Sequence, residues 1–65
     1  MNTNMPQVLI TGKYSAAETA RHLGVSTSTI RRWTRAGLMQ CQYRRINHRP
    51  FWYGEEIIRV WKSII

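Results

Sequence analysis

The chain has 65 residues, and its ten Lys and Arg side chains against three Asp and Glu give a formal net charge of +7. A single domain of this size buries only about 60% of the surface that its unfolded chain exposes, which leaves little room for an enzyme cleft. Eight of the ten basic residues are Arg, and the forked guanidinium group favours phosphate groups and base edges as partners. The composition therefore indicates one small domain with an anionic partner.

The residue types that carry catalysis or bind metals are sparse. Cys41 is the single cysteine, which excludes an internal disulfide and a cysteine-rich zinc site, and we interpret it as a small core residue. His22 and His48 lie in different segments, without acidic or thiol partners at ligand spacing. The sequence has no Gly-rich phosphate loop, no Ser, His and Asp set, and no 18-residue apolar run. We therefore expect no catalytic activity, metal, cofactor or membrane association, and a cytoplasmic protein located at the nucleoid.

The first twelve residues are predicted to form an N-terminal arm, followed by one domain over residues 13–65. Residues 1–7 are polar and contain Pro6, a composition typical of a disordered end. Residues 8–10 (VLI) favour a short extended segment that either pairs with a later hairpin or lies over the core. Residues 11–13 are expected to turn the chain into the first helix.

A first helix is predicted to begin near Ala16. Ser15 stands three residues before Glu18, the spacing of a capping box in which each side chain satisfies a free backbone N–H of the other residue. Three apolar residues recur at i, i+4 and i+7 on one face, namely Ala16, Ala20 and Leu23. Gly24 supplies the left-handed residue that ends the helix.

A second helix follows after a tight turn. Val25 is expected to fill the corner, and Ser26 is a good N-cap. Ile30 and Trp33 would face inward, before Gly37 ends the helix. Two short helices joined in this way predict a helix-turn-helix between residues 14 and 38.

The outer face of this second helix combines short hydroxyl groups with guanidinium groups. Its candidate DNA-binding residues are Ser26, Thr27, Ser28, Arg31, Arg32 and Arg35. Arg donates two parallel hydrogen bonds to guanine, while hydroxyls and the backbone N–H groups of a helix start hold phosphate. The alternative interpretation is a solvated basic face, which is common for helix charges. The strongly basic composition favours contact with DNA.

Residues 40–53 are predicted to form a β-hairpin, after Leu38 and Met39 return to the core. Aromatic and apolar residues flank a basic middle, and Asn47 with His48 is expected to form a two-residue turn with Asn47 left-handed. This turn would place Tyr43 opposite Trp52 and Arg44 opposite Phe51, with Cys41, Tyr43 and Trp52 on the inner face. Pro50 lacks an N–H donor, so we expect the hairpin at a sheet edge. The tip would then form a basic wing with DNA-binding candidates Arg44, Arg45, His48 and Arg49.

The last segment has the pattern of a helix that begins after Gly54. Ile57, Trp61 and Ile64 are spaced at i, i+4 and i+7 and are expected to close over the first two helices. Ile58 and Ile65 form a second apolar line. We favour a core helix with a frayed apolar end, and the alternative is a contact surface for another copy or another protein.

This order of elements resembles the winged-helix DNA-binding domains of the MerR-like superfamily, and most closely the small excisionases of phages and transposons. The resemblance lies in residues 16–20 (AAETA), 23–26 (LGVS), 29–33 (TIRRW) and 35–38 (RAGL). It covers roughly residues 13–62. The wing matches in kind only, because the family often has a Gly-rich basic tip where this chain has Ile46, Asn47 and His48.

The resemblance implies a mainly α winged helix-turn-helix with a small β-hairpin, whose second helix enters the major groove. By position it implies that Arg31, Arg32 and Arg35 contact the groove, and that the wing contacts phosphates or the adjacent minor groove. It further implies a protein that binds several adjacent sites, bends DNA and assists an integrase, or one that represses a promoter. The expected partners are double-stranded DNA and either neighbouring copies or an integrase, with a monomer in free solution.

Two alternatives stay open beside the excisionase-like hypothesis. One is a small MerR-like transcriptional regulator, although such regulators continue into a dimerising coiled coil that these residues do not contain. The other is a protein-interaction or docking module of a recombination or packaging complex, which would present Trp61, Ile64 and Ile65 to a partner while the charge aids solubility.

Overall fold

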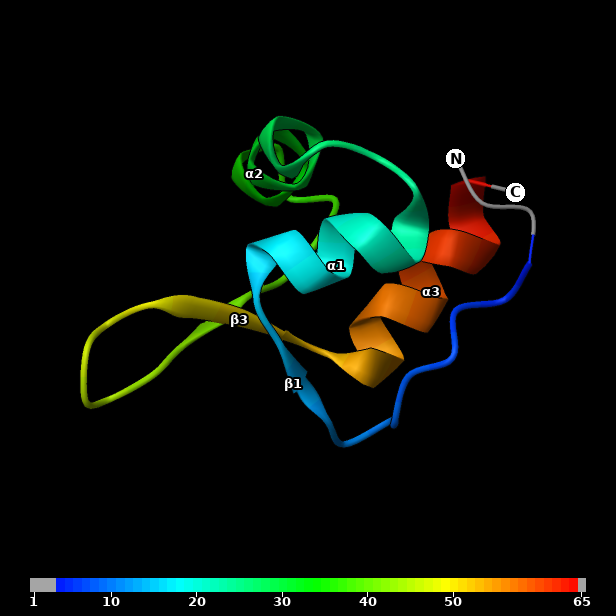
Figure 1. Ribbon diagram of the computed structural model, residues 1–65. Coiled ribbons are helices and arrows are strands. Elements are labelled where there is room, and N and C mark those ends of the chain that lie inside the picture. Colours follow the sequence, from blue (N-terminus) through cyan, green and yellow to red (C-terminus); the bar gives the residue numbers. More distant parts are fainter. Residues whose placement is uncertain (1–3, 65) are drawn as a thin grey trace.

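Within residues 4–64, which the computed structural model describes, the chain forms three helices and a three-stranded antiparallel sheet. In chain order these are β1 (Lys13–Tyr14), α1 (Ala16–Leu23), α2 (Thr27–Arg35), β2 (Gln42–Tyr43), β3 (Pro50–Tyr53) and α3 (Gly54–Ile64). The helices gather at one end of the molecule, and the hairpin of β2 and β3 projects from them as a wing (Figure 1). The fold is a winged helix-turn-helix, mainly α with a small β-hairpin, as the sequence predicts.

The predicted capping box fixes the start of α1. Ser15 Oγ accepts a hydrogen bond from the Glu18 amide at 3.2 Å, and Glu18 Oε1 accepts one from the Ser15 amide at 3.0 Å. At the other end Gly24 has a φ of 70°, and the next amide, of Val25, donates to the Ala20 carbonyl at 3.0 Å. Because a side chain is disfavoured at this φ, Gly ends the helix here.

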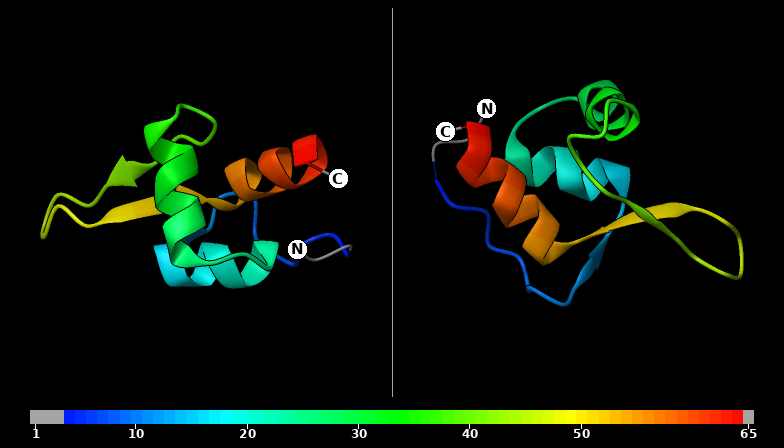
Figure 2. Two further views of the ribbon diagram at one scale, coloured as in Figure 1. Left: turned by 90° about the horizontal axis from the view of Figure 1, so that it is seen from above. Right: turned by 180° about the vertical axis from the view of Figure 1, so that it is seen from behind.

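α2 begins at the predicted N-cap, Ser26, whose Oγ accepts from the Thr29 amide at 3.2 Å. Ile30 is fully buried, and Trp33 is half-buried against the same core. Gly37 follows the helix with a φ of 84°. α2 crosses over α1 after the short turn, which confirms the predicted helix-turn-helix (Figure 2).

β1 adds to the expected turn before the first helix a strand that the sequence did not predict. Lys13 pairs with Tyr53 and Tyr14 with Trp52, so β1 adds an antiparallel strand to the sheet. The pairing places the start of the domain directly beside the strand that leads into α3.

The segment before β1 lies against the domain without forming a strand. The Gly12 amide donates to the Leu9 carbonyl at 2.9 Å, and Val8 packs over the core, the second of the two arrangements expected for residues 8–10. Pro6 is buried. Residues 1–3 of the predicted disordered end lie outside the described residues, and the arm boundary at residue 12 stays a prediction.

The register of the hairpin differs by two residues from the predicted one. Tyr43 pairs with Pro50 and Gln42 with Phe51, where the prediction paired Tyr43 with Trp52. The shift follows from a longer loop at the tip. Tyr43 keeps the face of Trp52, because a two-residue shift does not invert a strand, but it lies nearer the tip and is 64% exposed.

The sheet order is β1-β3-β2, so the hairpin of β2 and β3 lies at one edge of the sheet, as expected from Pro50, with β2 as the outer strand and β3 in the centre. Pro50 is the first residue of β3, whereas β1 pairs only with Trp52 and Tyr53. Because Pro50 lies beyond the end of β1, its missing N–H removes no hydrogen bond of that ladder.

The core lies where the three helices meet β3. Its buried side chains are Ala20, Leu23, Ile30, Met39, Trp52, Ile57 and Val60. The prediction placed Leu38 and Ile64 inside, but they are 59% and 42% exposed, because Leu38 lies on the loop that leaves α2 and Ile64 on the last turn of α3. Trp61 is half-buried against the core, and Ile65 lies outside the described residues.

Gly54 is the first residue of α3 and is buried. A β-carbon at this position would collide with the carbonyl oxygen of Leu9, and the Gly54 amide donates to the Gly12 carbonyl at 3.0 Å. Gly54 therefore permits the close approach of the N-terminal segment to the start of α3, in addition to ending the strand as expected.

Candidate nucleic-acid interface

The start of α2 presents the hydroxyl-bearing candidates. Ser26 Oγ is engaged with Thr29 Oγ1 at 3.0 Å as well as with the Thr29 amide, so its first role is to cap the helix. Ser28 is exposed and Thr27 is half-buried. The first amide groups of a helix have no partner within it, so this end is suited to an anionic oxygen.

The three arginines of α2 are all exposed, but the structure divides them into two groups. Arg31 and Arg35, one turn apart, line a groove between α2 and the wing. Arg32 lies outside this groove, and its Nη2 is 3.5 Å from Thr29 Oγ1. The three predicted arginines of α2 therefore form one basic face, and Arg31 and Arg35 lie on the edge of this face that is turned toward the wing.

This α2–wing groove has both polar and aromatic walls. Its lining residues are Arg31, Thr34, Arg35, Cys41, Tyr43, Pro50 and Trp52. Trp52 is buried, and its indole N–H donates to Thr34 Oγ1 at 3.2 Å, while Thr34 Oγ1 donates to the Ile30 carbonyl at 2.8 Å. The first bond ties the central strand of the sheet to α2, and the second, within α2, orients the Thr34 hydroxyl that accepts it.

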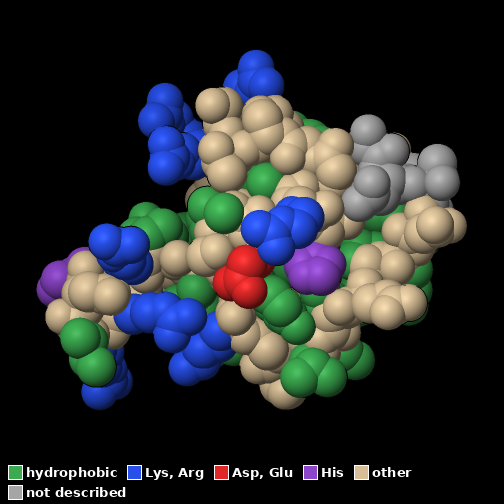
Figure 3. Space-filling view, in the orientation of Figure 1, with side chains coloured by type: hydrophobic (Ala, Val, Ile, Leu, Met, Phe, Trp, Pro, Cys, Tyr) green, Lys and Arg blue, Asp and Glu red, His purple; other side chains and the backbone are tan. Residues whose placement is uncertain are grey.

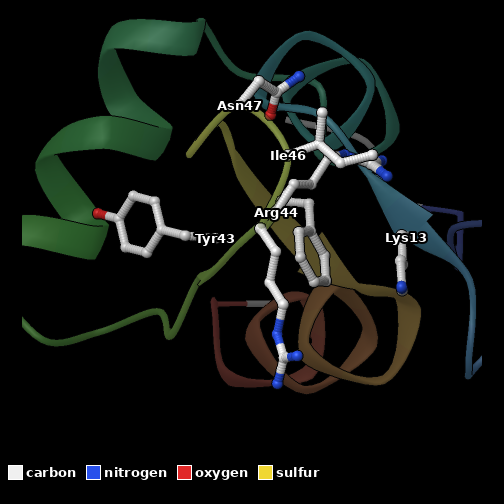
Figure 4. Close-up of a pocket in the computed structure, with 7 residues that line it drawn as sticks. Lys13, Tyr43, Arg44, Ile46 and Asn47 are labelled. Atoms are coloured by element: carbon white, nitrogen blue, oxygen red, sulfur yellow. The ribbon is translucent and has the colours of Figure 1, made fainter.

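Tyr43 belongs to this surface and was not among the predicted site residues. It is exposed and points from β2 toward α2, on the side of the wing opposite to Lys13 (Figure 4). Sequence reasoning missed it because the predicted register placed it on the inner face directly opposite Trp52, which is buried. The sequence signal that favours the exposure of Tyr43 is Pro50. This proline is the first residue of β3, and it is the residue with which Tyr43 pairs.

The tip of the wing is a four-residue loop, which corrects the predicted two-residue turn. The Arg44 amide donates to the Arg49 carbonyl at 2.9 Å, and the His48 amide donates back to the Arg44 carbonyl at 2.8 Å. Asn47 Oδ1 accepts from the Arg49 amide at 3.0 Å. His48, and not Asn47, has the left-handed φ of 56°. The loop therefore has a defined conformation, and all four basic candidates on it are exposed.

Lys13, on β1, adds a further positive charge at the base of the wing. The Lys13 Nζ lies 5.3 Å from the centroid of the Phe51 ring, and the Arg44 guanidinium lies at the same distance from that ring. Both charges are thus held by the quadrupole of one aromatic side chain. Lys13 was not predicted as a site residue because only the pairing of β1 with β3 brings it there.

The basic side chains gather over α2 and along the wing (Figure 3). Arg59 is different, because its guanidinium donates to Glu56 at 2.6 Å and to the Leu38 carbonyl at 2.9 Å. Arg59 therefore holds the loop after α2 against α3. The basic side chains that lie close to one another are those of α2, the wing and Lys13, whereas Arg21 and Lys62 lie in the last turns of α1 and α3.

The described residues contain no group of three or more His, Cys, Asp or Glu side chains placed to hold a metal ion. None of the helices in this part of the chain is long and apolar enough to cross a membrane.

Comparison with known proteins gives one family. A family model described as a helix-turn-helix domain matches residues 14–51, which span β1 to the start of β3 and include α1, α2 and the wing. No curated protein and no solved structure gives a significant match.

Proposed function

This chain belongs to the helix-turn-helix domain family, which indicates DNA binding, and we propose that it binds double-stranded DNA with α2 in the major groove and the wing over the neighbouring backbone and minor groove. The major groove admits an α-helix, and Arg side chains on that helix reach base edges. The proposed contacts from α2 are Ser26, Thr27, Ser28, Arg31, Arg32 and Arg35, and those from the wing are Arg44, Arg45, His48 and Arg49.

The α2–wing groove is the observation that supports this proposal most directly. A helix in the major groove and a wing in the adjacent minor groove must straddle one phosphate backbone. The groove lies between these two elements, and Arg31, Arg35 and the exposed Tyr43 line it. It therefore offers charged and hydroxyl donors where a backbone would pass.

The finer role we propose is that of an excisionase-like accessory protein of a mobile element, with no catalytic activity of its own. One helix and one wing make a small interface, and small interfaces give modest specificity. Neighbouring copies on adjacent sites, or a DNA-bound integrase, would then supply the rest, and the protein would be a monomer in free solution. The alternative is a small MerR-like repressor that acts on one promoter.

Selection of binding sites from random duplexes, followed by footprinting, tests both levels of the proposal. The matched control is the double variant that carries both Arg31→Ala and Arg35→Ala. Both side chains are exposed, so their loss leaves the core intact. Several phased sites in a recombination region support the excisionase-like role, whereas one palindrome in a promoter supports the repressor. Failure of the unmodified protein to enrich any duplex would contradict DNA binding itself.

A further inference from the structure

Ile46 is the most exposed large hydrophobic side chain among the described residues, at 97%. It stands in the turn of residues 45–47 at the end of the wing. Single exposed apolar residues are common on protein surfaces, so exposure alone indicates nothing. The surroundings of Ile46 are what distinguish it.

Two features set this position apart. The loop that carries Ile46 is held by the hydrogen bonds between Arg44 and Arg49, between His48 and Arg44, and between Arg49 and Asn47. In addition, the neighbouring basic side chains are all exposed around it. An apolar side chain is therefore presented at the far end of a projecting, cationic loop of defined shape, beside Asn47, while Tyr43, Arg44 and Lys13 are directed to other sides (Figure 4).

We propose that Ile46 enters the minor groove as an apolar wedge, partly unstacks one base step and bends the DNA. This inference rests on the proposed DNA binding and adds a contact that the basic residues do not provide. Minor-groove proteins use Phe, Leu, Ile, Met or Pro in this way to unstack and kink a base step. Ile46 has no hydrogen-bonding group, so its effect comes from shape and not from reading base edges.

The dimensions of the molecule are compatible with this placement. Its longest extent is 34 Å, and the wing lies along it away from α3 (Figure 1). One turn of B-DNA spans about 34–36 Å, so α2 and the tip of the wing lie within one turn of each other along the DNA. Arg45 and Arg49, on either side of Ile46 in the loop, would hold phosphate while the apolar side chain enters between them.

The wedge has a consequence for sequence preference. Pyrimidine–purine steps such as TA and CA are the most easily kinked and unstacked. We therefore expect such a step at the position that the wing covers, although Ile46 itself forms no hydrogen bond to it.

The experiment compares DNA bending and base stacking for variants at Ile46. A duplex that carries a selected site receives 2-aminopurine at the step under the wing and a dye at each end. With the unmodified protein, we expect a rise in 2-aminopurine fluorescence and a bend within the range of about 20–90° seen for such wedges. Ile46→Ala should lose most of both signals, and Ile46→Leu should keep them. Leu9→Ala, which removes a side chain that is 74% exposed outside the wing, is the matched control.

Ile46→Lys separates a wedge from a purely electrostatic tip. A wedge predicts that the added charge maintains or raises affinity while bend and fluorescence fall. Unchanged bend and fluorescence in Ile46→Ala and Ile46→Lys, with normal binding, would overturn the wedge and leave the proposed DNA binding intact. Absence of binding by the unmodified protein would contradict both.

Discussion

Thr34 is the residue at which α2 and the sheet are joined, through its hydrogen bond from the buried Trp52 indole. Thr34→Val preserves the shape of the side chain but leaves that N–H without its acceptor. We expect the free energy of unfolding to fall by about 1–3 kcal/mol, the usual cost of a buried unsatisfied group. Urea denaturation measures this loss, and Thr34→Ser, which keeps the hydroxyl, is the control. Equal stability of the Val variant and the unmodified protein would show that the bond is unimportant.

The arginines of α2 and of the wing should differ in what their loss does to binding. Arg31→Ala or Arg35→Ala is expected to cost about 1–3 kcal/mol on a selected site and less on random DNA, because a base contact discriminates between sequences. Arg45→Ala or Arg49→Ala should weaken both complexes similarly, because phosphate contacts carry no sequence information. Titrations on both duplexes provide the comparison. Equal losses for all four variants would mean that these surfaces are wrongly assigned.

At the scale of single residues, the sequence is most informative where a local rule fixes the side chain. Ser15, Ser26 and Gly24 are assigned correctly because caps depend only on neighbouring backbone groups. Tyr43 and Lys13 are missed because their positions depend on strand pairing. Neither the Tyr43 hydroxyl nor the Lys13 ammonium group has a local sequence signal that would place it on the DNA-facing surface.

At the scale of elements, the helix-turn-helix is predictable and the wing is predictable only in outline. The helices follow from caps and apolar spacing within a few residues. The register of the hairpin depends on which loop residue takes the left-handed conformation. In the structure this residue is His48, but the sequence is equally compatible with Asn47 in that role. A longer loop moves every pair along the strands, so Tyr43 lies opposite Pro50, two residues nearer the tip than predicted, while the faces of the strands stay the same.

The contact between α3 and the loop after α2 gives a pH-dependent prediction. The Glu56 carboxylate accepts from the Gln40 amide at 2.7 Å and from Arg59 Nε at 2.7 Å. The hydrogen bonds from Arg59 lower the pKa of Glu56 below its ordinary value of 4.5, with the Gln40 amide as a further cause. The folded state therefore binds this proton less readily than the unfolded state does. Its stabilisation is complete above the unfolded pKa and is lost as the pH falls through the lower folded pKa.

Glu56→Gln should accordingly reduce the free energy of unfolding at neutral pH, and the difference from the unmodified protein should shrink as the pH drops below that ordinary value. Chemical denaturation at a series of pH values measures both effects. Glu55→Gln, at the exposed neighbouring position, is the control. A difference that stays constant with pH would show that the Glu56 charge is not what stabilises the loop.

At the scale of the whole molecule, the charge predicts a strong dependence of DNA binding on salt. If about five phosphates are neutralised by α2 and the wing, log K should fall against log salt with a slope of roughly −4 to −5. Titration of one duplex at several salt concentrations gives the slope, and Arg45→Ala should make it shallower by about one. A flat dependence would be incompatible with the proposed phosphate contacts.

The position of β3 between β1 and β2 also determines the order in which the sheet can assemble. β2 and β3 are joined by a short loop, so their pairing closes few residues, whereas β1 pairs with β3 across nearly the whole domain. Long-range pairings form slowly because the entropy of the closed chain is lost before the contact is gained. We therefore expect the hairpin and the two-helix unit to form early and β1 to join last. In amide hydrogen exchange, the β1–β3 bonds should open before the core helices do, which would release Lys13 from the Phe51 ring while the rest of the DNA-facing surface stays folded.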